Sequence, residues 1–194
     1  MTNTSVADRR EQRRGQILAA AWDIAAEAGL GAVSLHEVAR RVGIRQPSLY
    51  GYVSSKLDLY DAMFAQAYEQ LLSRVDDVSP GGTAREQLVE LSRVVLEFVV
   101  ENPPRQQLLF QRTIPGFEPS PASYALANRL IDLCVRLLSA LGAGTQAHID
   151  AYTALIAGLG GQQVANDPGG DRYIRHLEKL LDLFLDHFVP QEPS

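Results

Sequence analysis

The sequence predicts an all-α fold. Apolar residues recur at helical spacing along nearly the whole chain, and capping residues, glycines and prolines divide it into separate segments. No stretch shows the alternation of apolar and polar residues that predicts a strand. The chain has 194 residues, of which 46% are hydrophobic and 21% charged, which suits a globular protein with a buried core. We therefore expect about nine helices.

Clear start and stop signals mark the first two expected helices. Apolar residues form one stripe over residues 10–28, and Gly29 stands where a helix commonly ends. Ser34 and Glu37 then form a capping box, in which each side chain bonds the other residue's backbone N–H. This box predicts a short helix that runs to Val42.

The next segment has the proportions of a helix-turn-helix. Gly43 follows the second helix and leads into a very short third helix at about 46–52. In such motifs the second helix of the pair enters the major groove of DNA. Arginine can pair with guanine and glutamine with adenine, and serine can bond a base or a phosphate. We therefore expect Arg45, Gln46 and Ser48 to read bases.

The same signals predict the helices of the body. A Ser-Pro-Gly-Gly run at 79–82 separates the head of the chain from this body. We expect a helix of about 20 residues from Ser55 and another after a capping box at Thr83. The later helices are expected at about 104–112, 121–140, 146–165 and 171–188.

Charge is distributed unevenly. The net charge of −5 alone argues against a protein that binds nucleic acid. However, residues 1–56 hold eight basic and five acidic side chains, whereas the other 138 residues hold ten basic and eighteen acidic ones. A basic head beside an acidic body indicates that only the head meets a polyanion. Four arginines at positions 9, 10, 13 and 14 either form an arm along DNA or are a solvated helix start.

Composition and motifs exclude several other classes. A single cysteine, Cys134, cannot form a disulfide framework or a cysteine-based zinc site. The four histidines show no metal-ligand spacing, and no nucleophile–base motif or phosphate loop is present, so we expect no metal, no cofactor and no enzyme activity. We expect a cytoplasmic protein without membrane association, since no apolar run reaches about 18 residues and the first 14 residues are polar.

Residues 15–64 resemble the N-terminal domain of the TetR family of transcriptional regulators. The resemblance rests on several spaced strings: 15–21, Ala28-Gly29, 34–44, 48–53 and 55–57. It implies that Tyr50, Tyr52 and Lys56 contact phosphates. It also implies that Arg45, Gln46 and Ser48 read bases. The helix start at Ser34 offers further N–H groups to a phosphate. The sequence departs from the family at Arg45, where Ser or Thr is usual, and at Val53, where Phe is usual.

The resemblance also implies an arrangement for the whole chain. Residues 1–56 would form the DNA-binding domain and residues 57–194 a domain for effector binding and dimerisation. The last two helices of each chain would pair with those of a second copy, which fits their small residues and their wide apolar stripe. The residues expected at this interface are Gly158, Gly161, Ile174, Leu177, Leu181 and Phe184.

An effector cavity is expected in the body. The residues expected to line it are Phe64, Phe98, Phe110, Leu130, Cys134 and Tyr152. The alternative for each is an ordinary place in the core, because aromatic residues at helical spacing usually pack there.

These features predict a homodimer that binds double-stranded, palindromic operator DNA and is released from it by a small molecule of unknown identity. Such a protein would be a transcriptional repressor. Two alternatives stay open: a transcriptional activator, and a helical small-molecule-binding protein with a vestigial head.

Overall fold

The computed structural model describes residues 5–76 and 81–188. Within these ranges the chain is all-helical and contains no strand. Residues 79 and 80 of the expected separating loop lie outside the described residues. The elements in chain order are α1 (Val6–Ala28), η1 (Leu30–Ala32), α2 (Leu35–Val42), α3 (Gln46–Leu49), α4 (Lys56–Asp76), α5 (Ala84–Val100), α6 (Pro103–Phe110), α7 (Pro121–Ala140), α8 (Gln146–Asn166), η2 (Ile174–His176) and α9 (Leu177–Phe188), where η marks a 3-10 helix.

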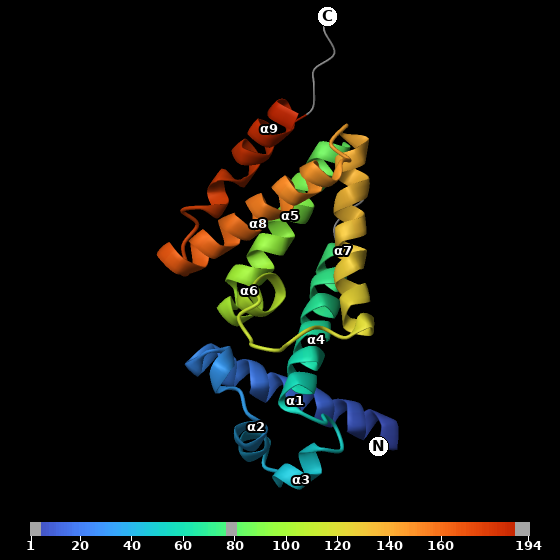
Figure 1. Ribbon diagram of the computed structural model, residues 1–194, viewed down its shortest axis with the longest axis vertical. Helices are drawn as coiled ribbons and strands as arrows, with labels where there is room; N and C mark the ends of the chain where they lie inside the picture. Colours follow the sequence, from blue (N-terminus) through green and yellow to red (C-terminus); the bar gives the residue numbers. More distant parts are fainter. Residues whose placement is uncertain (1–4, 77–80, 189–194) are drawn as a thin grey trace, which may run out of the picture.

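The first three helices form a head at one end of the molecule, and α4 rises from it into the body (Figure 1). The Ser34 hydroxyl accepts the Glu37 N–H at the start of α2, which is one of the two bonds of the expected capping box, whereas the Glu37 carboxylate accepts from Arg40. Gly43 ends α2 with a φ of 74°, a left-handed conformation that glycine adopts without steric cost. The chain therefore turns sharply between α2 and α3.

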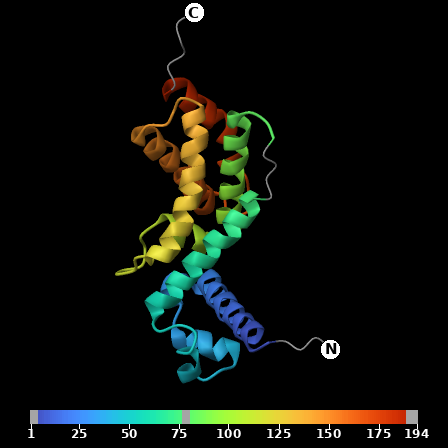
Figure 2. The same ribbon diagram turned by 90° about the vertical axis from the view of Figure 1, so that its right-hand side faces the viewer.

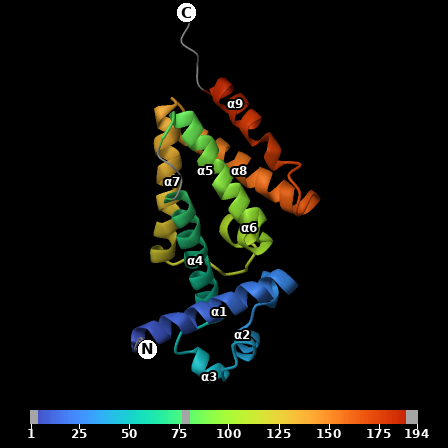
Figure 3. The same cartoon turned by 180° about the vertical axis from the view of Figure 1, so that it is seen from behind.

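The body is built from α4 to α9. In Figure 2, α4, α5 and α7 run side by side, and α8 and α9 lie against this layer. Figure 3 shows the same arrangement from behind, with α6 between the body and α1. The described residues include no helix with the length and hydropathy that crossing a membrane requires.

Three helix boundaries differ clearly from the expected ones, and the first helix begins at Val6 instead of residue 10. The third helix ends at Leu49 instead of residue 52, because the Tyr52 N–H already bonds the Leu49 carbonyl in a turn. The last helix begins at Leu177 and not at residue 171. The residues before it form a turn and the 3-10 helix η2, and the Gln163 side-chain carbonyl accepts the Tyr173 N–H at 2.9 Å.

The structure buries several residues that were expected at a dimer interface. Leu177, Leu181 and Phe184 are buried within the single chain, where α9 packs against α5 and α8. A Cβ at Gly161 would lie 3.3 Å from the Gln106 side chain, so this glycine faces α6. The core of one chain therefore accounts for these four residues. Gly158 faces open space, and Ile174 is half-buried.

Candidate functional site

The head presents the short helix α3 to solvent. Leu49 is fully buried and anchors α3 against the other helices of the head. Arg45 and Ser48 are exposed and Gln46 is half-buried, so all three expected base readers lie at or near the surface. Arg45 has no ion-pair partner among the described residues. A free guanidinium beside an amide and a hydroxyl can bond base edges in a groove.

The expected phosphate-contacting residues surround α3, and each has a different environment. Tyr50 is 52% exposed, whereas Tyr52 is half-buried. The ammonium group of Lys56 donates a 3.0 Å hydrogen bond to the Gly31 carbonyl. The Ser34 hydroxyl accepts a backbone N–H at the start of α2, and its own proton remains available to a phosphate oxygen.

The arginines of the head fall into two groups. Arg40 and Arg41 form ion pairs with Glu37 and Glu27, and the hydrogen bond from Arg41 lowers the pKa of Glu27. Arg10 instead donates to the Gly51 carbonyl at 3.1 Å, which joins the start of α1 to the turn after α3. Arg9, Arg10 and Arg13 border a hollow with Gly51 and Tyr52, beside the expected phosphate contacts.

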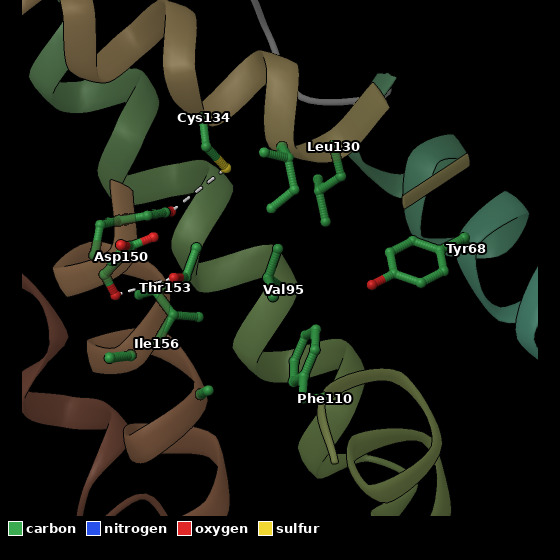
Figure 4. A pocket seen from close by; sticks show the side chains of 12 residues that line it. Tyr68, Val95, Phe110, Leu130, Cys134, Asp150, Thr153 and Ile156 are labelled. Carbon is green, nitrogen blue, oxygen red and sulfur yellow. Dashed lines mark hydrogen bonds between the residues drawn. The ribbon is translucent and has the colours of Figure 1, made fainter. Parts of the chain in front are cut away.

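The body contains a partly open cavity of about 400 Å³, which we call the α8 cavity. Helices α4 to α8 each contribute to its wall (Figure 4). Four of the six expected effector-cavity residues line it: Phe110, Leu130, Cys134 and Tyr152. The other lining residues are Tyr68, Val95, Ile131, Asp150, Thr153, Ala154, Ile156 and Ala157.

The polar atoms on one side of the α8 cavity bond one another. Tyr152 and Ser92 share a 2.8 Å hydrogen bond, and the Ser92 hydroxyl donates to the Leu88 carbonyl at 2.6 Å. The Cys134 thiol donates to the Tyr152 oxygen at 3.9 Å. Burial raises the pKa of Cys134 to about 11, and the pKa of Tyr152 is likewise raised by burial. These groups are therefore uncharged at neutral pH.

Tyr68 is a site residue that sequence reasoning missed. It lies on α4, one turn after Phe64, is only 6% exposed, and lines the α8 cavity. Its hydroxyl points toward Leu130, Val95 and Phe110 (Figure 4). An aromatic residue at helical spacing looks the same in sequence whether it faces a core or a cavity, so no signal distinguished it.

The remaining two expected cavity residues lie elsewhere. Phe64 lines a neighbouring cavity of about 280 Å³, the loop cavity, which shares Tyr68, Phe110 and Ile131 with the α8 cavity. Phe98 lines neither cavity. It is fully buried, with the guanidinium groups of Arg105 and Arg74 at 4.3 and 5.0 Å from its ring centre.

Comparison with known proteins identifies relatives of the head. Residues 17–63 match the family of bacterial regulatory proteins described as the tetR family. The HTH-type transcriptional activator FasR of Mycolicibacterium smegmatis is 29% identical over 140 residues, which are 72% of this chain and 64% of FasR. The chain spans 55% to 64% of the length of the first curated relatives that it matches. The relatives are transcriptional regulators, not enzymes.

Solved structures extend the likeness of fold to the body. FadR of Bacillus subtilis, in complex with stearoyl-CoA, superposes with a TM-score of 0.66 at 19% identity, over 89% of this chain and 97% of FadR. A TetR variant of Acinetobacter baumannii, in complex with minocycline, gives a TM-score of 0.65 at 20% identity, over 90% of this chain and 94% of that one. At these identities the likeness concerns the fold alone.

Proposed function

We propose that this chain is a transcriptional regulator of the tetR family and that it acts as a homodimeric repressor in the cytoplasm. Its α3 helices would bind two half-sites of a palindromic operator, and a small molecule in the α8 cavity would release it. The observation that carries the proposal is the exposed polar face of α3, backed by the buried Leu49, on a basic head.

The DNA-binding part of the proposal rests on the division of roles around α3. Arg45, Gln46 and Ser48 present groups that can bond base edges. Tyr50 and Tyr52 follow them in the turn after α3, and Lys56 begins α4, so hydroxyls and one ammonium group that suit phosphate oxygens come next in the chain. Two copies of such a head, related by two-fold symmetry, fit half-sites one helical turn of DNA apart.

The effector part of the proposal rests on the α8 cavity and on α4. A volume of about 400 Å³ lies within the range of small-molecule sites, and its walls are mainly apolar. Tyr68 on this wall and Tyr60, which bonds the head, lie on the same helix. A ligand that favours one position of α4 would therefore change how the head is held.

The similar structures do not select the effector. FadR was solved with stearoyl-CoA and the TetR variant with minocycline, two ligands with little chemistry in common. They support a small-molecule site in this fold without defining its contents. FasR is named an activator, which keeps activation as the second candidate function.

The first experiment is selection of bound sequences from a random DNA pool at near-physiological salt. We expect a two-fold symmetric motif. Gln46→Ala should then relax base preference at one position of each half-site, because glutamine pairs with adenine through two hydrogen bonds. Arg40→Ala is the matched control, since Arg40 is bound to Glu37 outside α3 and should leave base preference unchanged.

Two results would contradict the proposal. Equal losses of Gln46→Ala on the selected motif and on scrambled DNA would remove the base-reading role. Absence of any motif, both before and after unfolding and refolding to remove bound ligand, would show that the head does not read DNA sequence. A reporter gene under the selected motif then separates repression, which lowers expression, from activation, which raises it.

A further inference from the structure

The two tyrosine hydroxyls on the wall of the α8 cavity differ in how they are bonded. The Tyr152 hydroxyl belongs to the chain of hydrogen bonds that runs through Ser92 to the Leu88 carbonyl. The Tyr68 hydroxyl has no hydrogen-bond partner among the described residues, although the side chain is more than nine-tenths buried. It is aimed into the cavity (Figure 4).

A hydroxyl that faces a cavity and is bonded by no protein group is free to bond water or a ligand there. Burial also raises the pKa of Tyr68, so the hydroxyl keeps its proton at neutral pH and can donate it. An acceptor oxygen on a bound molecule would satisfy this donor. The cavity therefore favours ligands with an acceptor at this position.

The charges around the cavity limit what else the ligand can carry. Asp150 is the one charged residue among those described that line the α8 cavity, and it lies exposed on α8. No lysine, arginine or histidine is among these lining residues. A buried anion needs a paired charge or several donors, and the cavity supplies neither. Arg112 and Glu118, of opposite charge, line the loop cavity instead.

The rest of the wall is apolar. Val95, Leu130 and Ile156 are almost completely buried, and Phe110 adds an aromatic face. Such a surface stabilises a bound ligand in proportion to the apolar area of cavity and ligand that binding removes from water. The ligand's main body is thus expected to be hydrocarbon or aromatic.

We propose that the α8 cavity binds an uncharged lipophilic molecule whose carbonyl-type oxygen accepts a hydrogen bond from the Tyr68 hydroxyl. Asp150 adds selectivity, because its carboxylate repels anionic ligands at the rim. This proposal rests on the assignment of the α8 cavity as the effector site.

The test is a calorimetric titration of the folded full-length chain with three ten-carbon probes that differ in their head groups: 2-decanone, decanoate and decylammonium. We expect 2-decanone to bind most tightly and decanoate at least tenfold more weakly. Decanoate or decylammonium binding as tightly as the ketone would overturn the proposal, in favour of an anionic or a cationic ligand respectively. Absence of binding by the ketone would overturn it as well.

Two variants test the named residues. Tyr68→Phe removes only the donor and should weaken 2-decanone binding roughly threefold to tenfold. Tyr124→Phe is the matched control, since Tyr124 lines only the loop cavity, and it should leave this affinity unchanged. Asp150→Asn should raise the affinity for decanoate severalfold without changing that for the ketone. Unchanged ketone binding by Tyr68→Phe, with melting behaviour preserved, would overturn the role of the hydroxyl.

A separate measurement distinguishes the failure of this proposal from the failure of the proposed function. Release of selected operator DNA is measured with the same probes. If 2-decanone binds through Tyr68 but releases no DNA, the ligand class stands and the effector role of the cavity fails. If the chain binds its operator and another compound releases it while the ketone does not bind, the proposed function stands and this ligand class fails.

Discussion

The Tyr60 hydroxyl donates a buried 2.5 Å hydrogen bond to the backbone carbonyl of Leu30. Lys56, one turn earlier on α4, donates to the carbonyl of the next residue, Gly31, at 3.0 Å. The first turns of α4 therefore hold two successive carbonyls of η1, the turn between α1 and α2. This pair of bonds fixes the direction in which α4 leaves the head.

Tyr60→Phe tests this attachment. The substitution removes one of the two hydrogen bonds to the Leu30 carbonyl, which keeps the bond from the Val33 N–H, and we expect the free energy of unfolding to fall by about 0.5–1.5 kcal/mol. Urea unfolding followed by circular dichroism measures it. Tyr50→Phe is the control, because its hydroxyl is exposed and has no partner among the described residues. It should leave stability unchanged and weaken DNA binding, and an equal loss of stability in both variants would contradict the prediction.

Gly43→Ala should destabilise the head. The left-handed φ of 74° costs a residue with a Cβ about 1–2 kcal/mol. Gly15→Ala is the opposite case, since Gly15 lies within α1 and a Cβ there meets no atom within 4 Å. Alanine should stabilise this helix by about 0.5–1 kcal/mol. The two melting temperatures should therefore move in opposite directions, and a melting temperature that Gly43→Ala leaves unchanged or raises would contradict the prediction for this turn.

Cys134 should react slowly with iodoacetamide at pH 8. The thiolate is the reactive form, and a pKa of about 11 leaves it scarce at this pH. We expect alkylation at least about tenfold slower than for the chain unfolded in urea, where the thiol has its ordinary pKa. Because the pKa is raised on folding, this thiol stabilises the fold fully below its unfolded pKa and progressively less as pH rises toward 11. Equal rates for the folded and the unfolded chain would mean that the thiol is accessible.

Leu183→Asp should disrupt the proposed homodimer. Leu183 on α9 is 56% exposed, the most exposed large apolar side chain described in the body. An aspartate there would place a charge in an apolar interface. Sedimentation velocity should show a dimer for the unaltered chain and a smaller species for the variant. Leu57→Asp, which alters an exposed leucine at the start of α4, should remain dimeric, and a dimer for both variants would place the interface elsewhere.

Local signals allowed the head to be predicted well. The capping residue Ser34, the turn at Gly43 and the anchor at Leu49 are each recognised within a few residues of sequence. Their structural roles depend little on distant parts of the chain. The end of α3 was less predictable, because the turn that follows it is itself close to helical at Tyr50.

The body depended on long-range packing that sequence periodicity does not report. The stripe on α9 was real, and Leu181 and Phe184 pack against α5 and α8 of the same chain. Phe98 has the spacing of a cavity residue, yet its ring lies against the guanidinium groups of two arginines. Periodicity tells which face of a helix is apolar, and it does not tell what that face meets.

The unbroken course of α4 has a geometric consequence. A helix of 21 residues is about 30 Å long, so a tilt of about 5° at its body end displaces the far end by roughly 2–3 Å. In a two-fold assembly both arms swing, which would change the separation of the recognition helices by up to about twice that amount. DNA offers equivalent major-groove positions only every 34–36 Å or so. In the proposed dimer, the direction of α4 would thus set the half-site separation that the protein tolerates, and α3 would set the bases that it prefers.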